Sequence, residues 1–503
     1  MSLVLDRFRA WNYFLPGFED APMITDLFSS HDAQLPSKPK PFALLPLSTR
    51  ETRFQPCSSI NLSFSKLRLV DAVRLAPTSP QPQAVGTSIP PIHQLPTELV
   101  AEIFALCHAA EEDHRGNSAS ACARVILSHV CRRWRAVILC MPLLWSTISV
   151  HGPGDSSLSR LKAHLERSGT CPLSLRFIAH ISTTEGRVEN IADILTLAVA
   201  HAQRWRALRL YISEDHARPI LNLIRATSFP SIETLEISVD EWEQQDSHAI
   251  FEALSSSSIR KLSWRGPRGI PPSPHWTVLT HIHVRSPLSI CEAHTLLSQC
   301  HVVVELRLDS VSTEGSPSDR AMVTLPELEV LSVSTYEALD GFFDKLCTPR
   351  LRRLVLRHFD RISTSNDSCG AIDPFLARSN CALEELVFRD DHMPSDALDR
   401  LLRVPCLDTV RDLSIELPPL NDRALETLTR RMHGEFILPR LESLFFWRSQ
   451  STDGTLGDML ASRSQGGEHS LKRLRTGIDG SRLRDRHALD GLKLGGMDID
   501  YEC

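Results

Sequence analysis

Long apolar runs are missing from this sequence of 503 residues. A membrane-spanning helix needs about 18 to 20 consecutive apolar residues, and the nearest stretch, residues 136–150, is interrupted by Pro142. We therefore expect no membrane contact. Asp6, Arg7 and Arg9 stand where a secretory leader would need apolar side chains. The sequence thus favours a cytoplasmic or nuclear location, or both.

The 13 cysteines lack the close spacing of a disulfide framework. Their number is odd, and reduced thiols are the expectation for an intracellular chain. Cys291, His294, Cys300 and His301 form a loose cluster, but a structural zinc site usually has paired ligands such as CxxC. We expect packed side chains there and no metal.

Strong net charge and nucleotide-binding or catalytic motifs are absent as well. The net charge is only −6, whereas nucleic-acid-binding proteins are usually basic, so we expect no nucleic-acid partner. The sequence contains no GxxxxGK[ST], no HExxH and no GxSxG. No Ser/His/Asp or Cys/His set can be assembled from it. We expect a non-catalytic protein without a cofactor.

Proline is concentrated at the start of the chain, where residues 1–91 hold 12 of the 32 prolines. The stretch 76–91 reads APTSPQPQAVGTSIPP. Proline at this density interrupts helices and strands, which favours an extended linker. We predict that residues 1–91 are a disordered or weakly ordered proline-rich region.

Residues 92–150 show the spacing of short amphipathic helices. Two stripes fall on helical faces, the first formed by Leu95, Leu99, Ile103 and Leu106 and the second by Ile126, Val130, Trp134 and Val137. Pro96 suits a first helical turn, where its missing N–H costs nothing. Helices this short need a partner to cover their apolar faces. We predict a small helical domain, which either binds a partner or caps the C-terminal part of the chain.

A template of the form apolar-x-x-apolar-x-apolar then recurs eleven times. Its central apolar residues are Leu208, Leu235, Leu262, Ile282, Leu306, Leu331, Leu354, Leu386, Leu413, Leu444 and Leu474. Leucine-rich repeats have this core at about 20–29 residues per unit, each a strand followed by a helix. The observed steps vary from 20 to 32 residues, so we predict an irregular solenoid.

The whole chain is therefore predicted to have an α/β fold. A small helical domain precedes a leucine-rich-repeat domain over 201–480, with a parallel sheet and outer helices. Residues 151–200 are expected to be a transitional capping segment. Residues 481–503 are expected to be a tail, in which Asp498, Asp500 and Glu502 form a solvated acidic end.

Four segments of residues 92–150 resemble the F-box family, and most of all the F-box-like proteins of mushroom-forming fungi. They read Leu95-Pro96-Thr97-Glu98-Leu99, Glu102-Ile103-Phe104, Val130-Cys131-Arg132-Arg133-Trp134-Arg135 and Met141-Pro142-Leu143-Leu144-Trp145. The resemblance implies helices that pack against a Skp-family adaptor, which connects to a cullin and a RING subunit. The polar insert 108–120 is longer than the compact motif of the family.

Carried over residue by residue, the resemblance predicts adaptor binding or internal packing for seven apolar positions. They are Leu95, Pro96, Leu99, Ile103, Phe104, Val130 and Trp134. The chain is then expected to be the substrate-recognition subunit of an SCF-type ubiquitin ligase. The alternatives are a Skp-binding scaffold that recruits no cullin and a repeat protein unconnected with ubiquitin.

Arginines recur on the strand positions that would face a client protein. Arg285, Arg307, Arg357 and Arg389 follow or interrupt the apolar template. Arginine clusters bind carboxylates and phosphates through paired hydrogen bonds. We therefore predict that an acidic client segment binds near these four residues.

Overall fold

The computed structural model describes residues 91–113, 123–151, 155–179, 188–213 and, apart from short gaps in the connecting segments, 220–502. The proline-rich region predicted for residues 1–91 lies outside these residues, apart from Pro91. The chain divides into two compact units, Met1–Leu144 and Trp145–Cys503. No helix within the described ranges has the length and apolar character needed to cross a membrane.

The N-terminal unit is helical where it is described. Its elements are η1 (Pro91–Gln94), α3 (Thr97–Asp113), α4 (Ala123–Ser128), α5 (Arg132–Leu139) and η2 (Pro142–Trp145), which runs into the next unit. Pro96 immediately precedes α3, and Glu98 lies in its first turn, where a carboxylate complements the helix dipole. The predicted insert 108–120 begins inside α3, which continues to Asp113.

The second predicted stripe does not lie on one helix. Cys131 adopts an extended conformation between α4 and α5, and its Sγ accepts a hydrogen bond from the backbone N of Trp134 at 3.4 Å. This cap starts a new helix, so Ile126 and Val130 are not in helical phase with Val137. As a result Val137 is buried, whereas Ile126 and Val130 are exposed.

The C-terminal unit contains one long sheet in which every described pairing is parallel. Its strands, in spatial order, are β1 (Thr147–His151), β2 (Leu173–Ala179), β3 (Trp205–Ile212), β4 (Thr234–Val239), β5 (Lys261–Arg265), β6 (His281–Val284), β8 (Glu305–Ser312), β10 (Val330–Thr335), β12 (Arg353–His358), β13 (Glu385–Asp390), β14 (Asp412–Leu417), β15 (Ser443–Phe446), β16 (Arg473–Gly477) and β17 (Asp498–Glu502). A short strand, β7 (Leu288–Ser289), pairs with β8, and β9 (Val323–Thr324) pairs with β11 (Leu346–Cys347). The predicted mixed fold with a mainly parallel sheet is confirmed.

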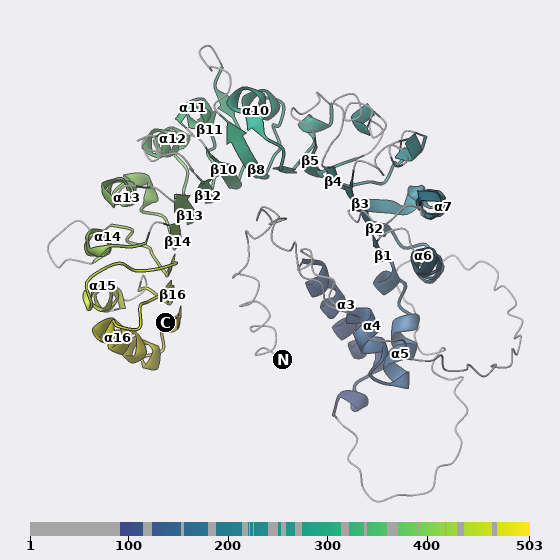
Figure 1. The fold of residues 1–503 in the computed structure, drawn as a ribbon, viewed down its shortest axis with the longest axis horizontal. Helices are drawn as coiled ribbons and strands as arrows, with labels where there is room; N and C mark the ends of the chain where they lie inside the picture. Colours follow the sequence, from purple (N-terminus) through teal and green to yellow (C-terminus); the bar gives the residue numbers. More distant parts are fainter. Residues whose placement is uncertain are drawn as a thin grey trace, which may run out of the picture. The chain divides into compact units, whose positions relative to one another are not determined.

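Helices connect most of these strands. They are α6 (Asp155–Arg167), α7 (Val188–Val199), α10 (Ile290–Leu297), α11 (Asp340–Phe343), α12 (Ile372–Ser379), α13 (Ser395–Leu402), α14 (Asp422–Leu428), α15 (Thr455–Ser464) and α16 (Leu483–Leu494), with one-turn helices η3 (Ala202–Arg204), η4 (Pro274–Thr277) and η5 (Pro405–Leu407). Within this unit the strands follow the inner side of the curved chain path and the helices line the outer side (Figure 1).

The eleven template residues pair with one another across the sheet. Each central apolar residue is the register partner of the next, from Leu208 with Leu235 through to Leu444 with Leu474. All eleven are at most 3% exposed. Burying one such leucine stabilises a fold by about 1.5–3 kcal/mol, so this row is a main contribution to the core.

The sheet is longer at both ends than the predicted boundaries. Residues 151–200, expected to be a transitional cap, hold α6 and β2, and β2 pairs with β1 and β3. Residues 481–503, expected to be a tail, form α16 and β17. Ile499 is buried opposite Leu474, while Asp498 and Asp500 point to solvent. The short apolar pattern of this last strand explains why its place in the sheet was missed.

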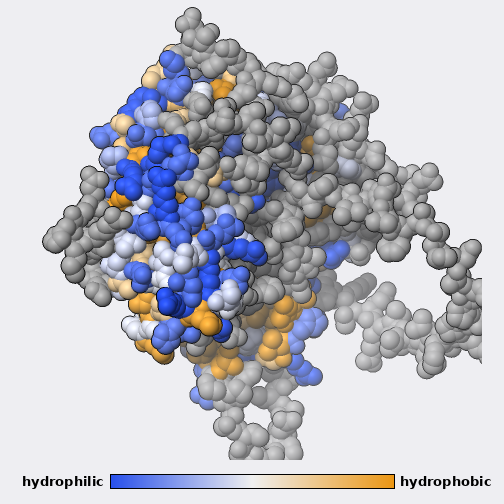
Figure 2. Space-filling model, turned by 60° about the vertical axis from the view of Figure 1, so that its left-hand side comes forward, coloured by the Kyte–Doolittle hydropathy of each residue, from blue (hydrophilic) through white to orange (hydrophobic). Residues whose placement is uncertain are grey.

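Figure 2 brings the side that carries α13–α16 forward, and most of its described surface is hydrophilic. Asp399 of α13 forms the centre of an ion network on these helices. Its carboxylate lies 3.2 Å from Arg403 Nε and 3.1 Å from Arg423 Nη2, and it accepts a hydrogen bond from Thr427. Burial alone would raise the pKa of Asp399, but Thr427, Arg403 and Arg423 lower it overall.

This lowered pKa predicts a pH-dependent contribution to stability. Asp399→Asn should lose about 1 kcal/mol at pH 7, since both arginines are largely exposed. A carboxyl group whose pKa is lowered by folding stabilises the fold fully at pH values above its unfolded pKa, which is about 3.9. This stabilisation is lost as the pH falls through the pKa of the group in the folded chain. Thermal denaturation should show that the melting temperatures of the parent chain and Asp399→Asn differ at pH 7 and become equal toward pH 3. A difference in melting temperature that stays the same at every pH would contradict a stabilising role for the ionised Asp399.

Candidate functional site

Helix α3 is apolar on two faces. Val100, Phe104 and His108 follow i, i+4, i+8 spacing and are buried, with 1%, 1% and 6% exposure. The predicted stripe lies on another face, where Leu99 is 46% and Leu106 is 63% exposed. The helix therefore packs into its own unit through one face and presents the predicted stripe to the outside.

The buried face of α3 packs against α5. The rings of Phe104 and Trp134 meet edge to face at a centroid distance of 5.0 Å. Arg133 donates a hydrogen bond to the carbonyl of Leu95 at 2.5 Å, which ties the start of α3 to α5. Buried Arg124 of α4 donates to the carbonyl of Leu144 at 3.0 Å. These contacts hold the three helices in a defined arrangement.

The seven predicted positions separate into three groups. Phe104 is buried and belongs to the internal packing; Leu95, Ile103 and Trp134 are half-buried; and Pro96, Leu99 and Val130 are exposed. The helices thus bring exposed and half-buried apolar residues into one small unit. Burial thus distinguishes a residue of the internal packing from residues at the surface, which the motif alone could not do.

Exposed apolar side chains are concentrated in this unit. Of the fifteen large apolar residues that are exposed among the described residues, eight lie between positions 92 and 143. This exposed apolar set consists of Ile92, Leu99, Leu106, Val125, Ile126, Val130, Leu139 and Leu143. Apolar exposure of this kind is typical of surfaces that bind a protein, a membrane or a ligand. Only Leu99 and Val130 of this set are among the seven predicted positions, although Leu106, Ile126 and Leu143 also stand in the predicted stripes or the motif.

The last part of the motif contributes to the C-terminal unit. Trp145 is 8% exposed, its ring meets that of His164 at 5.2 Å, and the guanidinium of Arg167 lies 4.4 Å from its ring centre. Both partners belong to α6. Trp145 therefore anchors the first helix of the sheet unit and is not part of the exposed apolar set.

The four predicted client-binding arginines lie on the sheet face opposite the buried leucines, and three of them have firm partners. Arg307 donates to Glu305 at 2.6 Å, and Arg357 donates two hydrogen bonds to Glu416 at 3.3 and 3.1 Å. The guanidinium of Arg389 lies 4.9 Å from the ring centre of Phe359. Arg285 approaches a carboxylate only to 3.6 Å. The four are thus spread over the sheet and differ in how strongly they are held.

The loose cysteine and histidine cluster is divided between core and surface. Cys300 is buried, and burial raises the pKa of its thiol to about 12. His294 is also buried, its Nε2 hydrogen-bonded to the carbonyl of Phe342 at 2.9 Å, and burial lowers its pKa. His301 is exposed and Cys291 is half-buried. No group of three potential metal ligands occurs within the described part of the chain.

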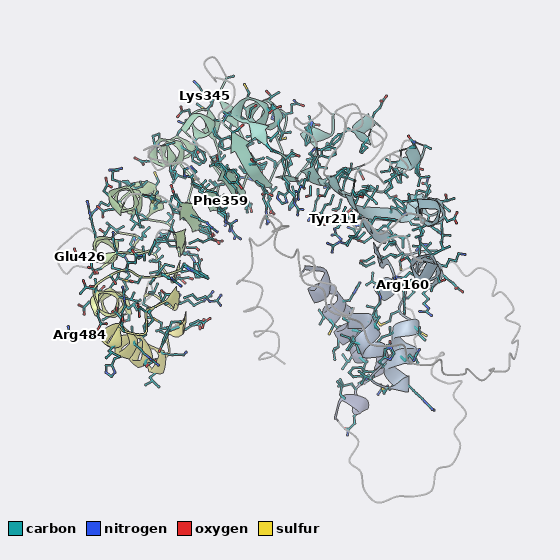
Figure 3. All side chains as sticks on the ribbon, viewed as in Figure 1. Arg160, Tyr211, Lys345, Phe359, Glu426 and Arg484 are labelled. Carbon is teal, nitrogen blue, oxygen red and sulfur yellow. The ribbon has the colours of Figure 1, made fainter. Side chains whose placement is uncertain are left out.

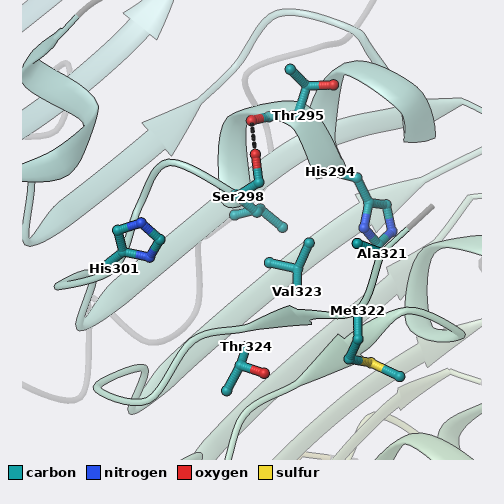
Figure 4. A pocket seen from close by; sticks show the side chains of 9 residues that line it. His294, Thr295, Ser298, His301, Ala321, Met322, Val323 and Thr324 are labelled. Carbon is teal, nitrogen blue, oxygen red and sulfur yellow. Dashed lines mark hydrogen bonds between the residues drawn. The ribbon is translucent and has the colours of Figure 1, made fainter.

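His294 and His301 also line a cavity of about 290 Å³ between α10 and β9. Figure 4 shows His294, Thr295 and Ser298 on one side and Met322, Val323 and Thr324 on the other. The hydroxyl of Ser298 is used within α10, where it donates to the carbonyl of Thr295 at 2.7 Å. The lining contains no carboxylate, so it suits a small neutral group better than a cation.

Comparison with known proteins identifies one region of the chain. A family model described as F-box-like matches residues 92–151. No curated protein matches the sequence. Residues 92–151 therefore form an F-box-like domain, a type that generally binds Skp1-type adaptors and typically occurs in non-catalytic adaptor subunits.

Proposed function

From the F-box-like domain at residues 92–151, we propose that this chain is the substrate-recognition subunit of an SCF-type ubiquitin ligase. The observation that carries the proposal is the coincidence of this domain with the exposed apolar set. An amphipathic helix that offers its apolar face to a groove is a common mode of protein recognition. In this role the chain has no catalytic residue of its own and works in the cytoplasm, the nucleus or both.

Adaptor binding would use the half-buried and exposed members of the predicted seven. Leu95, Pro96, Leu99, Ile103, Val130 and Trp134 would contact the adaptor, and Phe104 would hold α3 on α5. Each fully covered leucine is worth about 1.5–3 kcal/mol. Through the adaptor the chain would be linked to a cullin and a RING subunit.

The C-terminal unit would hold the client. We infer that it is an irregular leucine-rich-repeat solenoid of the kind found in F-box proteins, including those of fungi that the motif resembles. The support is the row of paired template residues and the placing of strands and helices on opposite sides. A client held on this unit would be brought close to the ubiquitin-loaded enzyme, so the chain contributes proximity rather than chemistry.

Affinity purification with mass spectrometry tests the assembly. The full chain should co-purify with a Skp-family adaptor and a cullin, and Leu95→Asp/Pro96→Ala should lose both. Leu494→Asp, at a site 90% exposed on α16, is the matched control and should retain them. An adaptor without any cullin would favour the Skp-binding scaffold. Absence of the adaptor would favour a cap on a repeat protein unconnected with ubiquitin.

A further inference from the structure

Four arginines gather on the sheet face opposite the buried leucines, across β2 to β6. Arg176 and Arg209 are register partners on β2 and β3. Arg265 of β5 pairs with Ser238, and Arg285 lies beside it, because its backbone N donates to the carbonyl of Trp264 at 2.7 Å. We call these four residues the basic patch.

Glu236 of β4 is the carboxylate at the centre of the basic patch. Its oxygens lie 3.5 Å from Arg209 Nε and 3.6 Å from Arg285 Nη2. Both are charge contacts beyond the usual N–H···O hydrogen-bond length of about 2.7–3.2 Å. Glu236 thus attracts two guanidinium groups without occupying their hydrogen-bond donors firmly.

Tyr211 supports the same arrangement from β3, and Figure 3 places it on the inner side of the sheet. The guanidinium of Arg176 lies 4.9 Å from its ring centre. Burial, followed by the charge of Glu236 and a hydrogen bond to it, raises the pKa of Tyr211 to about 12. The phenol ring thus holds the guanidinium of Arg176 against the strand that carries Arg209.

The patch differs from the arginines farther along the sheet. Arg307 and Arg357 donate hydrogen bonds to Glu305 and Glu416, whereas Arg265 is exposed and makes no ion pair with the described residues. Asp309 borders the patch on β8 and is hydrogen-bonded to His283 at 2.9 Å. Among the described residues of this face, and with Asp309 counted, the patch brings four guanidinium groups together with two carboxylates. Positive charge is therefore in excess here.

We propose that the basic patch binds a short acidic segment of a client protein. This proposal rests on the proposed function and adds the chemistry of the client. The site differs from the one predicted from the sequence: Arg285 belongs to both, but Arg176, Arg209 and Arg265 take the place of Arg307, Arg357 and Arg389. Carboxylates of the client would take up the donors that Glu236 leaves unused, through charge-assisted hydrogen bonds.

The dimensions of the patch fit a peptide. Five strands, β2 to β6, span four spacings of about 4.8 Å, or about 19 Å in all. An extended chain advances about 3.3 Å per residue, so about six residues cross the patch. Asp309 ends the excess of positive charge at β8. Asp309 would repel a continuous polyanion such as a nucleic acid that ran on across β8, whereas a short acidic stretch would end before reaching it.

Fluorescence anisotropy on the full chain tests the proposal. The probe is a labelled peptide with six consecutive glutamates between Gly/Ser flanks, compared with the same peptide carrying glutamines. We expect the glutamate peptide alone to bind, more weakly at higher salt, and Arg265→Glu/Arg285→Glu to weaken it at least about tenfold. Arg357→Glu, a single charge reversal of the same kind on β12, should leave affinity within about threefold.

Equal binding of the glutamine peptide, or unchanged binding by the double variant, would overturn the proposal. If the double variant has the same melting temperature as the parent chain, its loss of peptide binding is a local effect and not a result of unfolding. The same peptide is also measured on Leu99→Asp/Val130→Asp, which changes only the N-terminal unit and should bind it as the parent does. A parent chain that binds the peptide but no adaptor would reject the ligase role and leave the acidic-segment site standing.

Discussion

Leu99→Asp/Val130→Asp should abolish binding of the Skp-type adaptor to the purified chain. Leu99 is 46% and Val130 is 54% exposed, so neither substitution removes much internal packing. In a complex each side chain would contribute about half of the 1.5–3 kcal/mol that complete burial is worth, because it is already half covered. A carboxylate in its place would in addition lose its hydration without a partner. Together the two changes should weaken binding by at least about a hundredfold.

Isothermal titration calorimetry with purified adaptor measures this effect. The matched control is Leu483→Asp/Leu494→Asp, which introduces the same charges at residues 69% and 90% exposed on α16. It should bind the adaptor as tightly as the parent chain. Binding by the Leu99/Val130 variant within a few-fold of the parent would show that these helix faces are not the adaptor surface.

Phe104→Ala should unfold the N-terminal unit. The side chain is 1% exposed and packs edge to face on Trp134, so its removal opens a cavity in the centre of three short helices. Truncating a buried phenylalanine costs about 3–5 kcal/mol. A unit this small has only a few kcal/mol of stability to lose. Adaptor binding should disappear together with the helices.

Hydrogen exchange measured by mass spectrometry separates this effect from the loss of a surface contact. In Phe104→Ala the amides of α3, α4 and α5 should exchange rapidly, while those of the central strands stay protected. Leu106→Ala is the matched control, since Leu106 lies on the same helix but is 63% exposed, and it should change stability by less than about 0.5 kcal/mol. Unchanged protection in Phe104→Ala would refute the central packing role of this residue.

The strands of the C-terminal unit could be predicted from the sequence because their apolar pattern is local. Alternation with a period of two defines a strand face whatever surrounds it. Leu208 and Leu235 pair in the structure as the repeated template requires. The alternation is too short to show this in β17, where Ile499 is the only fully apolar residue of the strand that the sheet buries. The position of β17 in the sheet depends on its pairing with β16.

The candidate surfaces were less predictable, since they depend on contacts between distant segments. Both Leu99 and Phe104 fit an apolar helix face, and only the packing of α5 shows that Phe104 is the internal one. Arg285 and Arg357 look equivalent along the chain. They differ because Glu236 lies across the sheet from the first at 3.6 Å, whereas Glu416 accepts two hydrogen bonds from the second.

By itself, the sequence determined the F-box-like segment, the eleven strands of the template and the parallel sheet, because residue order and apolar period are properties of the chain alone. The tertiary structure decided which face of α3 is exposed, where the sheet ends and which arginines remain loosely paired. Burial and ion pairing are set by neighbours in space, and those neighbours come from segments that lie on average far apart in the sequence.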